Sequence, residues 1–223
     1  MPDAVYPAEA APDAEAEEKG RLLFAAPCRF VAGAALEAAI PDAALPEVAF
    51  AGRSNVGKSS LINALTGQSA LARVSRTPGR TRQINFFDLG GRLALVDLPG
   101  YGYAEAAKRE IARWTQLIER YLRGRADLRR VVLLIDARFG IKEADRPVMK
   151  LCDEAAVSFQ VALTKADLVT ERELALLLPQ LAAELQKHNA AHPVIHITST
   201  RGGAGIAALR ASLAALAAER PSR

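Results

Sequence analysis

A glycine-rich run near residue 52 has the composition of a phosphate-binding loop. The run Gly52-Arg53-Ser54-Asn55-Val56-Gly57-Lys58-Ser59 fits the pattern G-x-x-x-x-G-K-[ST] and lies between an apolar stretch and a helical pattern. Its glycines let the backbone curl with successive N–H groups pointing inward, and the helix start adds the positive end of its dipole. We therefore expect Lys58 to contact the β- and γ-phosphates of a nucleotide and the Ser59 hydroxyl to bind Mg²⁺.

A second acidic site follows the apolar stretch Leu93–Val96, where Asp97 is succeeded by Leu98, Pro99 and Gly100. In enzymes with a phosphate loop, a carboxylate at such a strand end holds Mg²⁺ through water. The N–H group of the following glycine is then free to approach the γ-phosphate. We expect all four residues to line the nucleotide site.

The run Thr164-Lys165-Ala166-Asp167 indicates which base is bound. The Asp167 carboxylate can accept two hydrogen bonds from guanine, at N1–H and the 2-amino group, whereas adenine presents no such pair. The stem of Lys165 can lie over the base. Thr198, Ser199 and Thr200 follow the last expected strand and complete the base site. An ATP-dependent kinase remains the alternative until GTP and ATP are compared as competitors.

A loop between the two phosphate-side motifs is expected to respond to the γ-phosphate. Thr81 is the candidate threonine that binds Mg²⁺ only when the γ-phosphate is present, with Thr77 as its competitor. Thr77-Pro78-Gly79 is typical of a mobile loop. The expected nucleotide-binding residues here are Gly79, Arg80, Thr81, Arg82 and Gln83.

The residue expected to orient the attacking water is missing. Many GTPases have a glutamine directly after the Asp-x-x-Gly segment, but this chain has Tyr101 there. We expect slow unstimulated hydrolysis, on the order of 10⁻³ s⁻¹ or below. Asn55 offers a replacement, since its carboxamide could help hold K⁺ beside the β–γ bridging oxygen. Alternatively, Asn55 only stabilises the loop backbone.

Short apolar runs that alternate with longer helical patterns predict an α/β protein. Together with the phosphate loop and the Thr164–Asp167 segment, they predict a three-layer P-loop NTPase of the small G-protein type. Its mostly parallel, six-stranded sheet should carry helices on both faces. Gly90-Gly91 predicts a hairpin, and Thr170 with Glu173 predicts a capping box. The expected strands are Glu47–Ala51, Ile84–Leu89, Leu93–Asp97, Val131–Asp136, Phe159–Thr164 and Val194–Thr198, and the expected helices are Lys58–Thr66, Glu105–Arg123, Asp145–Ala156, Thr170–Asn189 and Gly205–Ala218.

The ends and the composition set the domain organisation. Residues 1–20, with six acidic groups and one basic group, are expected to be a disordered acidic tail before a GTP-binding domain at 21–220. Phe30 and Val31 could add an edge strand. No apolar run approaches the roughly 20 residues of a membrane span. Without a secretion signal, and with two isolated cysteines, the chain is expected to be a cytoplasmic monomer.

Basic residues suggest a polyanionic partner, because the chain carries a net charge of +4 despite its acidic start. Two groups of arginines could contact RNA phosphates. The second group could equally be a solvated cap on a helix end. The first group is Arg73, Arg76, Arg80 and Arg82, and the second is Arg120, Arg123, Arg125, Arg129 and Arg130.

Taken together, these residues resemble the EngB family (also called YihA or YsxC) of bacterial GTPases. The resemblance implies a GTP-dependent factor in assembly of the large ribosomal subunit and its rRNA, with an association to normal cell division and septum formation. The alternative is a GTP-gated scaffold for a division protein, in which hydrolysis is incidental. The matching stretches are Leu45–Ser60, Pro78–Thr81 with Asn85–Phe87, Asp97–Ala104 and Thr164–Asp167.

Overall fold

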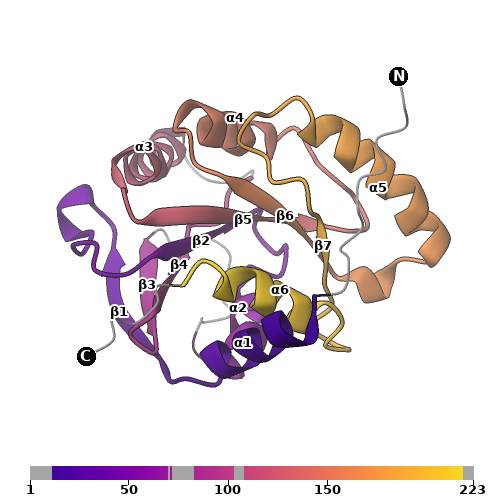
Figure 1. The fold of residues 1–223 in the computed structure, drawn as a ribbon. Coiled ribbons are helices and arrows are strands. Elements are labelled where there is room, and N and C mark those ends of the chain that lie inside the picture. Colours follow the sequence, from indigo (N-terminus) through magenta and orange to yellow (C-terminus); the bar gives the residue numbers. More distant parts are fainter. Residues whose placement is uncertain (1–11, 70, 72–82, 103–107, 218–223) are drawn as a thin grey trace.

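A seven-stranded sheet forms the middle layer of the protein. The structure, a computed structural model, describes residues 12–69, 71, 83–102 and 108–217 (Figure 1). The strand order is β1-β3-β4-β2-β5-β6-β7, with β1 and β3 antiparallel to their neighbours and the other pairs parallel. The strands are β1 (Cys28–Ala34), β2 (Glu47–Gly52), β3 (Ile84–Leu89), β4 (Leu93–Asp97), β5 (Leu128–Asp136), β6 (Phe159–Thr164) and β7 (His196–Ile197).

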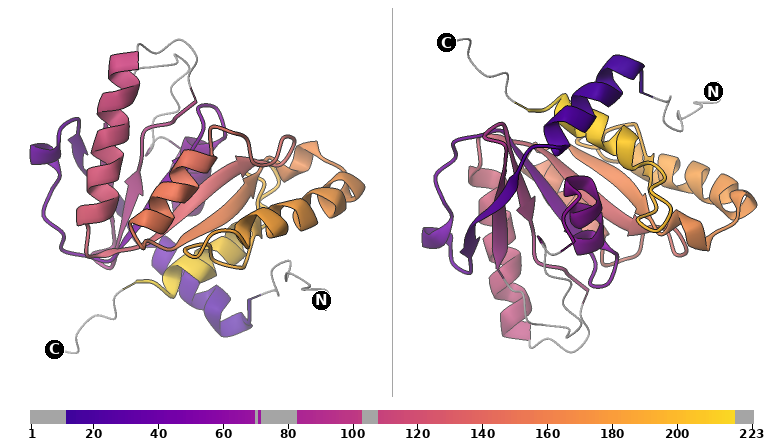
Figure 2. Two further views of the ribbon diagram at one scale, coloured as in Figure 1. Left: turned by 90° about the horizontal axis from the view of Figure 1, so that it is seen from above. Right: turned by 90° about the horizontal axis from the view of Figure 1, so that it is seen from below.

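Helices cover both faces of the sheet, as predicted (Figure 2). On one face lie α3 (Lys108–Gly124), α4 (Arg146–Glu154) and α5 (Glu171–Leu185). On the other lie α1 (Ala14–Phe24), α2 (Lys58–Thr66) and α6 (Ile206–Ala214). Each face buries its own apolar core. No described helix has both the length and the apolar character needed to span a bilayer.

The predicted count of six strands is one too low, because β1 adds an outer strand beside β3. Phe30 and Val31, the positions considered for an edge strand, lie in β1. The register shifts between Phe30 and Ala32, so Val31 forms a bulge, and the Phe30 ring packs edge-on against Phe87 at 5.8 Å. The residues from Arg29 to Val31 are all exposed, which hides the alternation that marks a strand in a sequence.

The prediction of a disordered tail over residues 1–20 is wrong for Ala14–Gly20, which belong to α1. Asp13 caps this helix by accepting a hydrogen bond from the Ala16 N–H group at 2.7 Å. A Cβ atom on Gly20 would lie 2.6 Å from the backbone nitrogen of Ala211, so the glycine lets α1 cross very close to α6. The helix is stabilised by this distant contact, which the polar local sequence does not reveal.

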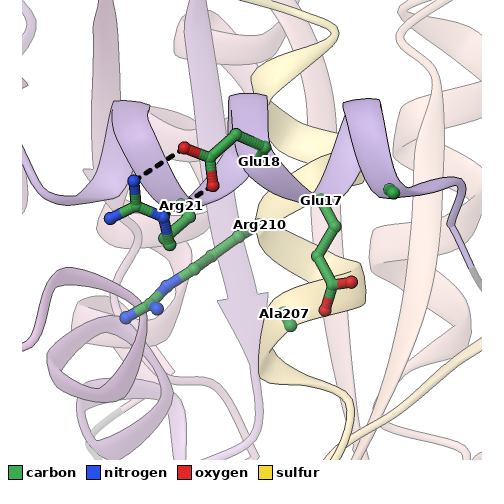
Figure 3. A pocket seen from close by; sticks show the side chains of 6 residues that line it. Glu17, Glu18, Arg21, Ala207 and Arg210 are labelled. Carbon is green, nitrogen blue, oxygen red and sulfur yellow. Dashed lines mark hydrogen bonds and ion pairs between the residues drawn. The ribbon is translucent and has the colours of Figure 1, made fainter.

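A side chain of α6, Arg210, connects three helices; Figure 3 shows it beside α1. Arg210 donates hydrogen bonds to the backbone oxygens of Ala64 and Leu65 at the end of α2. Its guanidinium group also lies 5.8 Å from the centre of the Phe24 ring of α1. Near it, a cavity of about 260 Å³ opens between α1 and α6, beside the Glu18–Arg21 ion pair. The helix that starts at the phosphate loop is therefore fastened at its far end by α6.

The predicted hairpin and capping box are confirmed, whereas two predicted elements are shorter in the structure. Gly90 and Gly91 both have positive φ, of 61° and 65°, and form the predicted hairpin between β3 and β4. Thr170 and Glu173 form the predicted capping box. Helix α5 stops at Leu185 instead of Asn189, and only His196–Ile197 of the last predicted strand is paired.

Candidate nucleotide-binding site

The phosphate loop connects β2 to α2 in the predicted position. Gly52 is required by packing, because a Cβ atom there would lie 2.8 Å from Cγ1 of Val56. Gly57, directly before α2, has a φ of 106°, which only glycine adopts readily. Asn55 also has a left-handed φ, of 64°. The backbone thus curls around the start of α2, where free N–H groups favour an anion.

Lys58 and Asp97 meet at the start of α2. The Lys58 amino group forms an ion pair with Oδ1 of Asp97, and both side chains are nearly buried. The parallel pairing of β2 with β4 brings Asp97 here, opposite Phe50. Ser59 follows Lys58 in the first turn of α2, so a hydroxyl and a carboxylate come from segments that meet at one point. Both groups offer oxygen atoms, the ligands that Mg²⁺ prefers, and the residues present therefore fit this ion.

The segment Leu98-Pro99-Gly100 runs directly against the phosphate loop. The Leu98 N–H group donates to the backbone oxygen of Phe50 at 3.0 Å. A Cβ atom on Gly100 would lie 3.4 Å from the backbone nitrogen of Ser54, so this residue is in van der Waals contact with the loop. The predicted approach of Gly100 to the phosphate site agrees with this packing.

The Thr164–Asp167 segment is joined to the phosphate loop by two side chains. The hydroxyl of Thr164 donates to the backbone oxygen of Val56 at 2.7 Å, and the Lys165 amino group donates to that of Asn55, also at 2.7 Å. Lys165 itself has a left-handed φ of 58°, which turns the chain outward after β6. Two hydrogen bonds therefore join the predicted base-binding segment to the predicted phosphate loop.

The last predicted loop lies beside Asp167. The Ser199 hydroxyl donates to Oδ1 of Asp167 at 2.6 Å, and the Ala166 N–H group donates to the backbone oxygen of Thr198 at 3.1 Å. Ser199 is buried, whereas Asp167 is exposed to solvent. A buried hydroxyl thus orients the Asp167 carboxylate, whose Oδ2 and remaining Oδ1 lone pair can accept further hydrogen bonds.

Asp136 holds Lys165 in place and was not among the predicted site residues. Its Oδ2 accepts a hydrogen bond from Lys165 at 2.9 Å, and Arg138 binds the same carboxylate through two nitrogens. Burial raises the pKa of Asp136, but the hydrogen bonds from Arg138 and Lys165 outweigh it and hold the pKa well below its usual value. Asp136 ends β5 directly beside Thr164 in the sheet, and this neighbourhood depends on the register between β5 and β6, which the sequence does not give.

The predicted switch residues lie mostly outside the described part of the chain. These residues are Thr77, Gly79, Arg80, Thr81 and Arg82. Gln83 is described, and its amide donates to the side-chain oxygen of Asn85 at 3.0 Å. The same amide lies against Gly33 of β1. The structure therefore places the Gln83 side chain at the β1–β3 edge of the sheet.

Two arginines of the second basic group are turned inward. Arg125 binds both carboxylate oxygens of the buried Glu47 and donates to the backbone oxygen of Pro41. Arg130 donates to the side-chain oxygen of Gln160 at 2.8 Å. The guanidinium groups of these two residues are therefore engaged inside the protein. Arg120, Arg123 and Arg129 remain about half exposed.

The fold and these three joined segments define a P-loop GTPase. A family model described as "50S ribosome-binding GTPase" matches residues 47–165. The probable GTP-binding protein EngB of Rhodospirillum rubrum is 58% identical over 92% of this chain and 90% of its own length. That of Cereibacter sphaeroides is 54% identical over 95% and 97%. The chain belongs to the EngB family of GTP-binding proteins, and its activity is that of a GTPase that binds GTP and GDP.

Solved structures agree with this assignment. The crystal structure of a probable GTP-binding protein EngB aligns with a TM-score of 0.60 and 26% identity, covering 76% of this chain and 97% of that chain. Aquifex aeolicus Era bound to GDP and AlF4⁻ aligns with a TM-score of 0.62 at 19% identity, over 78% and 57% of the two chains. At that identity, the Era match supports the fold alone.

Proposed function

We propose that this GTPase is a slow, nucleotide-dependent switch that acts in the cytoplasm during assembly of the large ribosomal subunit. The family model named for 50S binding supports the ribosomal part, because it spans the phosphate loop, Asp97 and Lys165. The bond between Ser199 and Asp167 supports guanine as the recognised base. A switch of this kind binds its partner in one nucleotide state and leaves it in the other.

The phosphate side of the site would be served by Lys58, Ser59 and Asp97. Lys58 would exchange its ion pair with Asp97 for phosphate oxygens, while Ser59 and, through water, Asp97 would hold Mg²⁺. The magnesium ion would neutralise charge on the phosphate oxygens. Thr81, in a part of the chain that the structure does not describe, remains the candidate for the additional magnesium ligand.

Slow hydrolysis is supported by the position of Tyr101. Its side chain is buried, and its hydroxyl donates to Asp145 at 2.8 Å, away from the phosphates. It therefore cannot orient a water molecule as a glutamine does in other GTPases. The Asn55 side chain is exposed on the phosphate loop, where its carboxamide would help hold K⁺ beside the β–γ bridging oxygen. The left-handed φ of Asn55 also supports the alternative, a purely conformational role.

The exposed members of the basic group would contact rRNA phosphates. Arg120, Arg123 and Arg129 have ion-pair partners at the surface, and such pairs are weak enough to be exchanged for phosphates. Arg73, Arg76, Arg80 and Arg82 lie outside the described residues and stay candidates for phosphate contact. Binding should weaken steeply as salt concentration rises, because each phosphate contact releases counterions.

Co-sedimentation with ribosomal particles tests the proposal. The wild-type protein should sediment with large-subunit precursors in the presence of a non-hydrolysable GTP analogue and much less with GDP. The small subunit serves as the control particle. Equal sedimentation in both nucleotides, or none with the large subunit, would contradict the ribosomal switch.

Depletion in cells separates ribosome assembly from the family's association with division and septation. If the primary role is assembly, incomplete large subunits should accumulate before septation fails. A septation defect that precedes any change in the subunit profile would instead support a scaffold for a division protein.

A further inference from the structure

One buried carboxylate connects the phosphate loop, the segment after Gly100 and the turn before α4. Asp145, at the start of α4, is fully buried. Its Oδ1 accepts the hydroxyl hydrogen of Tyr101 at 2.8 Å, and its Oδ2 accepts the N–H group of Lys142 at 2.8 Å. The same Oδ2 lies 3.4 Å from Nε of Arg53, the second residue of the phosphate loop.

The backbone of Tyr101 binds the phosphate loop from the other side. Its N–H group donates to the backbone oxygen of Gly52 at 3.3 Å, and its own oxygen accepts from the N–H group of Ser54 at 2.9 Å. Tyr101 and Arg53 therefore pair like neighbours in a parallel sheet. Gly102 follows with a left-handed φ of 77°, so the chain turns away immediately after this contact.

The buried charges of Arg53 and Asp145 compensate each other. Among the described residues, Nε and Nη2 of Arg53 are buried without a hydrogen-bond partner, so the nearby Asp145 carboxylate is what compensates the cation. Burial, reinforced by Asp145, raises the pKa of Tyr101 well above its usual value. The hydroxyl therefore remains a neutral donor throughout the working pH range. The network fixes Tyr101 at both its backbone and its side chain.

We propose that Asp145 is a positioning residue which, through Tyr101 and Arg53, holds Gly100 against the phosphate loop and so sets the preference for GTP over GDP. Gly100 precedes the fixed residue and packs on Ser54. Its N–H group can therefore meet a γ-phosphate only while Tyr101 stays in place. GDP has no γ-phosphate, so its affinity should not depend on this contact. The inference rests on the proposed nucleotide switch and names the residues that set it.

The substitution Tyr101→Phe tests this role, with Tyr121→Phe as a matched control. Tyr121 is also a buried tyrosine, and its hydroxyl donates to the Glu47 carboxylate at 2.8 Å. Glu47 begins β2, whereas the phosphate loop follows the end of β2, so the two hydroxyls lie at opposite ends of one strand. Both variants lose a buried hydroxyl–carboxylate bond, and both should have a lower Tm.

The two variants should differ in nucleotide preference. Y101F should bind a non-hydrolysable GTP analogue about fivefold more weakly, the effect of roughly one hydrogen bond, with GDP affinity nearly unchanged. Y121F should keep the wild-type ratio of the two dissociation constants. An unchanged ratio in Y101F, or an equal change in Y121F, would overturn the proposal. Failure of the wild-type protein to bind guanine nucleotides would instead refute the proposed function itself.

Hydrogen exchange provides a second measurement that needs no variant. The N–H groups of Ser54 and Tyr101 donate in the bonds described above, so both should exchange slowly. They should exchange more slowly with the GTP analogue than with GDP. Equal exchange rates in the two nucleotides would contradict the proposal even if the Y101F protein failed to fold. The substitution Asp145→Asn should shift the ratio of the dissociation constants for the GTP analogue and GDP in the same direction as Tyr101→Phe.

Discussion

The amino group of Lys165 donates a hydrogen bond to the backbone oxygen of Asn55 at 2.7 Å, which joins the segment expected to read the base to the loop expected to hold the phosphates. The same amino group is held by Asp136. A change at Lys165 should therefore affect binding of the whole nucleotide, whichever phosphates it carries.

The substitution Lys165→Ala should weaken GTP and GDP equally, by about tenfold or more, because two hydrogen bonds of a charged donor are lost. Titration with fluorescent nucleotides measures both affinities. Lys142→Ala is a suitable control, since that side chain is exposed and lies near the Phe139 ring. Loss of GTP affinity alone would contradict the shared connection.

The substitution Asp167→Asn should change which base is bound. An amide offers a donor where the carboxylate accepts from the 2-amino group of guanine, so GTP affinity should fall by about a hundredfold. Xanthosine triphosphate, with an oxygen at that position, should bind more tightly to the variant than to the wild type. Asp42→Asn, at an exposed position, should alter neither affinity. Unchanged GTP affinity in D167N would show that Asp167 does not recognise the guanine base.

Potassium dependence can be separated from backbone conformation at Asn55. Glycine tolerates the left-handed φ of this position, so Asn55→Gly removes the carboxamide without straining the loop. We expect hydrolysis to be several-fold faster in K⁺ than in Na⁺ for the wild type, and equal in the two salts for N55G. Steady-state phosphate release measures both. Identical wild-type rates in the two salts would leave Asn55 only its conformational role.

The buried pair of Glu47 and Arg125 should make a large contribution to stability. Both side chains are almost fully buried, and Arg125→Met would leave the Glu47 carboxylate without its cation. The free energy of unfolding should fall by about 3 kcal/mol. Arg123→Met, which breaks only exposed ion pairs, should cost less than about 1 kcal/mol. Denaturant unfolding compares the two, and equal losses would show that burial does not govern the effect.

Acid should selectively remove the contribution of Asp136. Because the folded-state pKa of this carboxyl lies below its unfolded value, its stabilisation is present at neutral pH. It is lost as the pH falls below about 4, the usual value for an aspartate, toward the folded-state pKa. The stability difference between wild type and Asp136→Asn should therefore shrink from pH 7 to pH 3. A difference that grows on acidification would contradict this sign.

The sequence predicted those features whose signal is local. The phosphate loop, Asp97 and the Thr164–Asp167 segment each lie directly beside a strand or helix of recognisable pattern, and the structure brings these segments together. Asp136 was not predicted as a site residue because an aspartate at a strand end is common. Only the register of β5 with β6 shows that Asp136 lies beside Thr164 and can bind Lys165. The contacts of the switch loop around Thr81 stay predictions.

Features that depend on distant partners were not predicted. Helix α1 requires contact with α6 at Gly20, and a local reading of its acidic residues indicated disorder. Arg125 looked like a surface arginine because its partner, Glu47, is far away in the chain. In each case burial against a remote segment overrides the local pattern.

The hydrogen bonds from Arg210 to the end of α2 have a consequence for synthesis of the chain. Helix α2, which follows the phosphate loop, needs α6 to complete its packing, and α6 is translated some 140 residues later. A nascent polypeptide that has not yet released α6 from the exit tunnel should therefore hold nucleotide poorly. Tight binding should then require that α6 has been synthesised and has packed against α2.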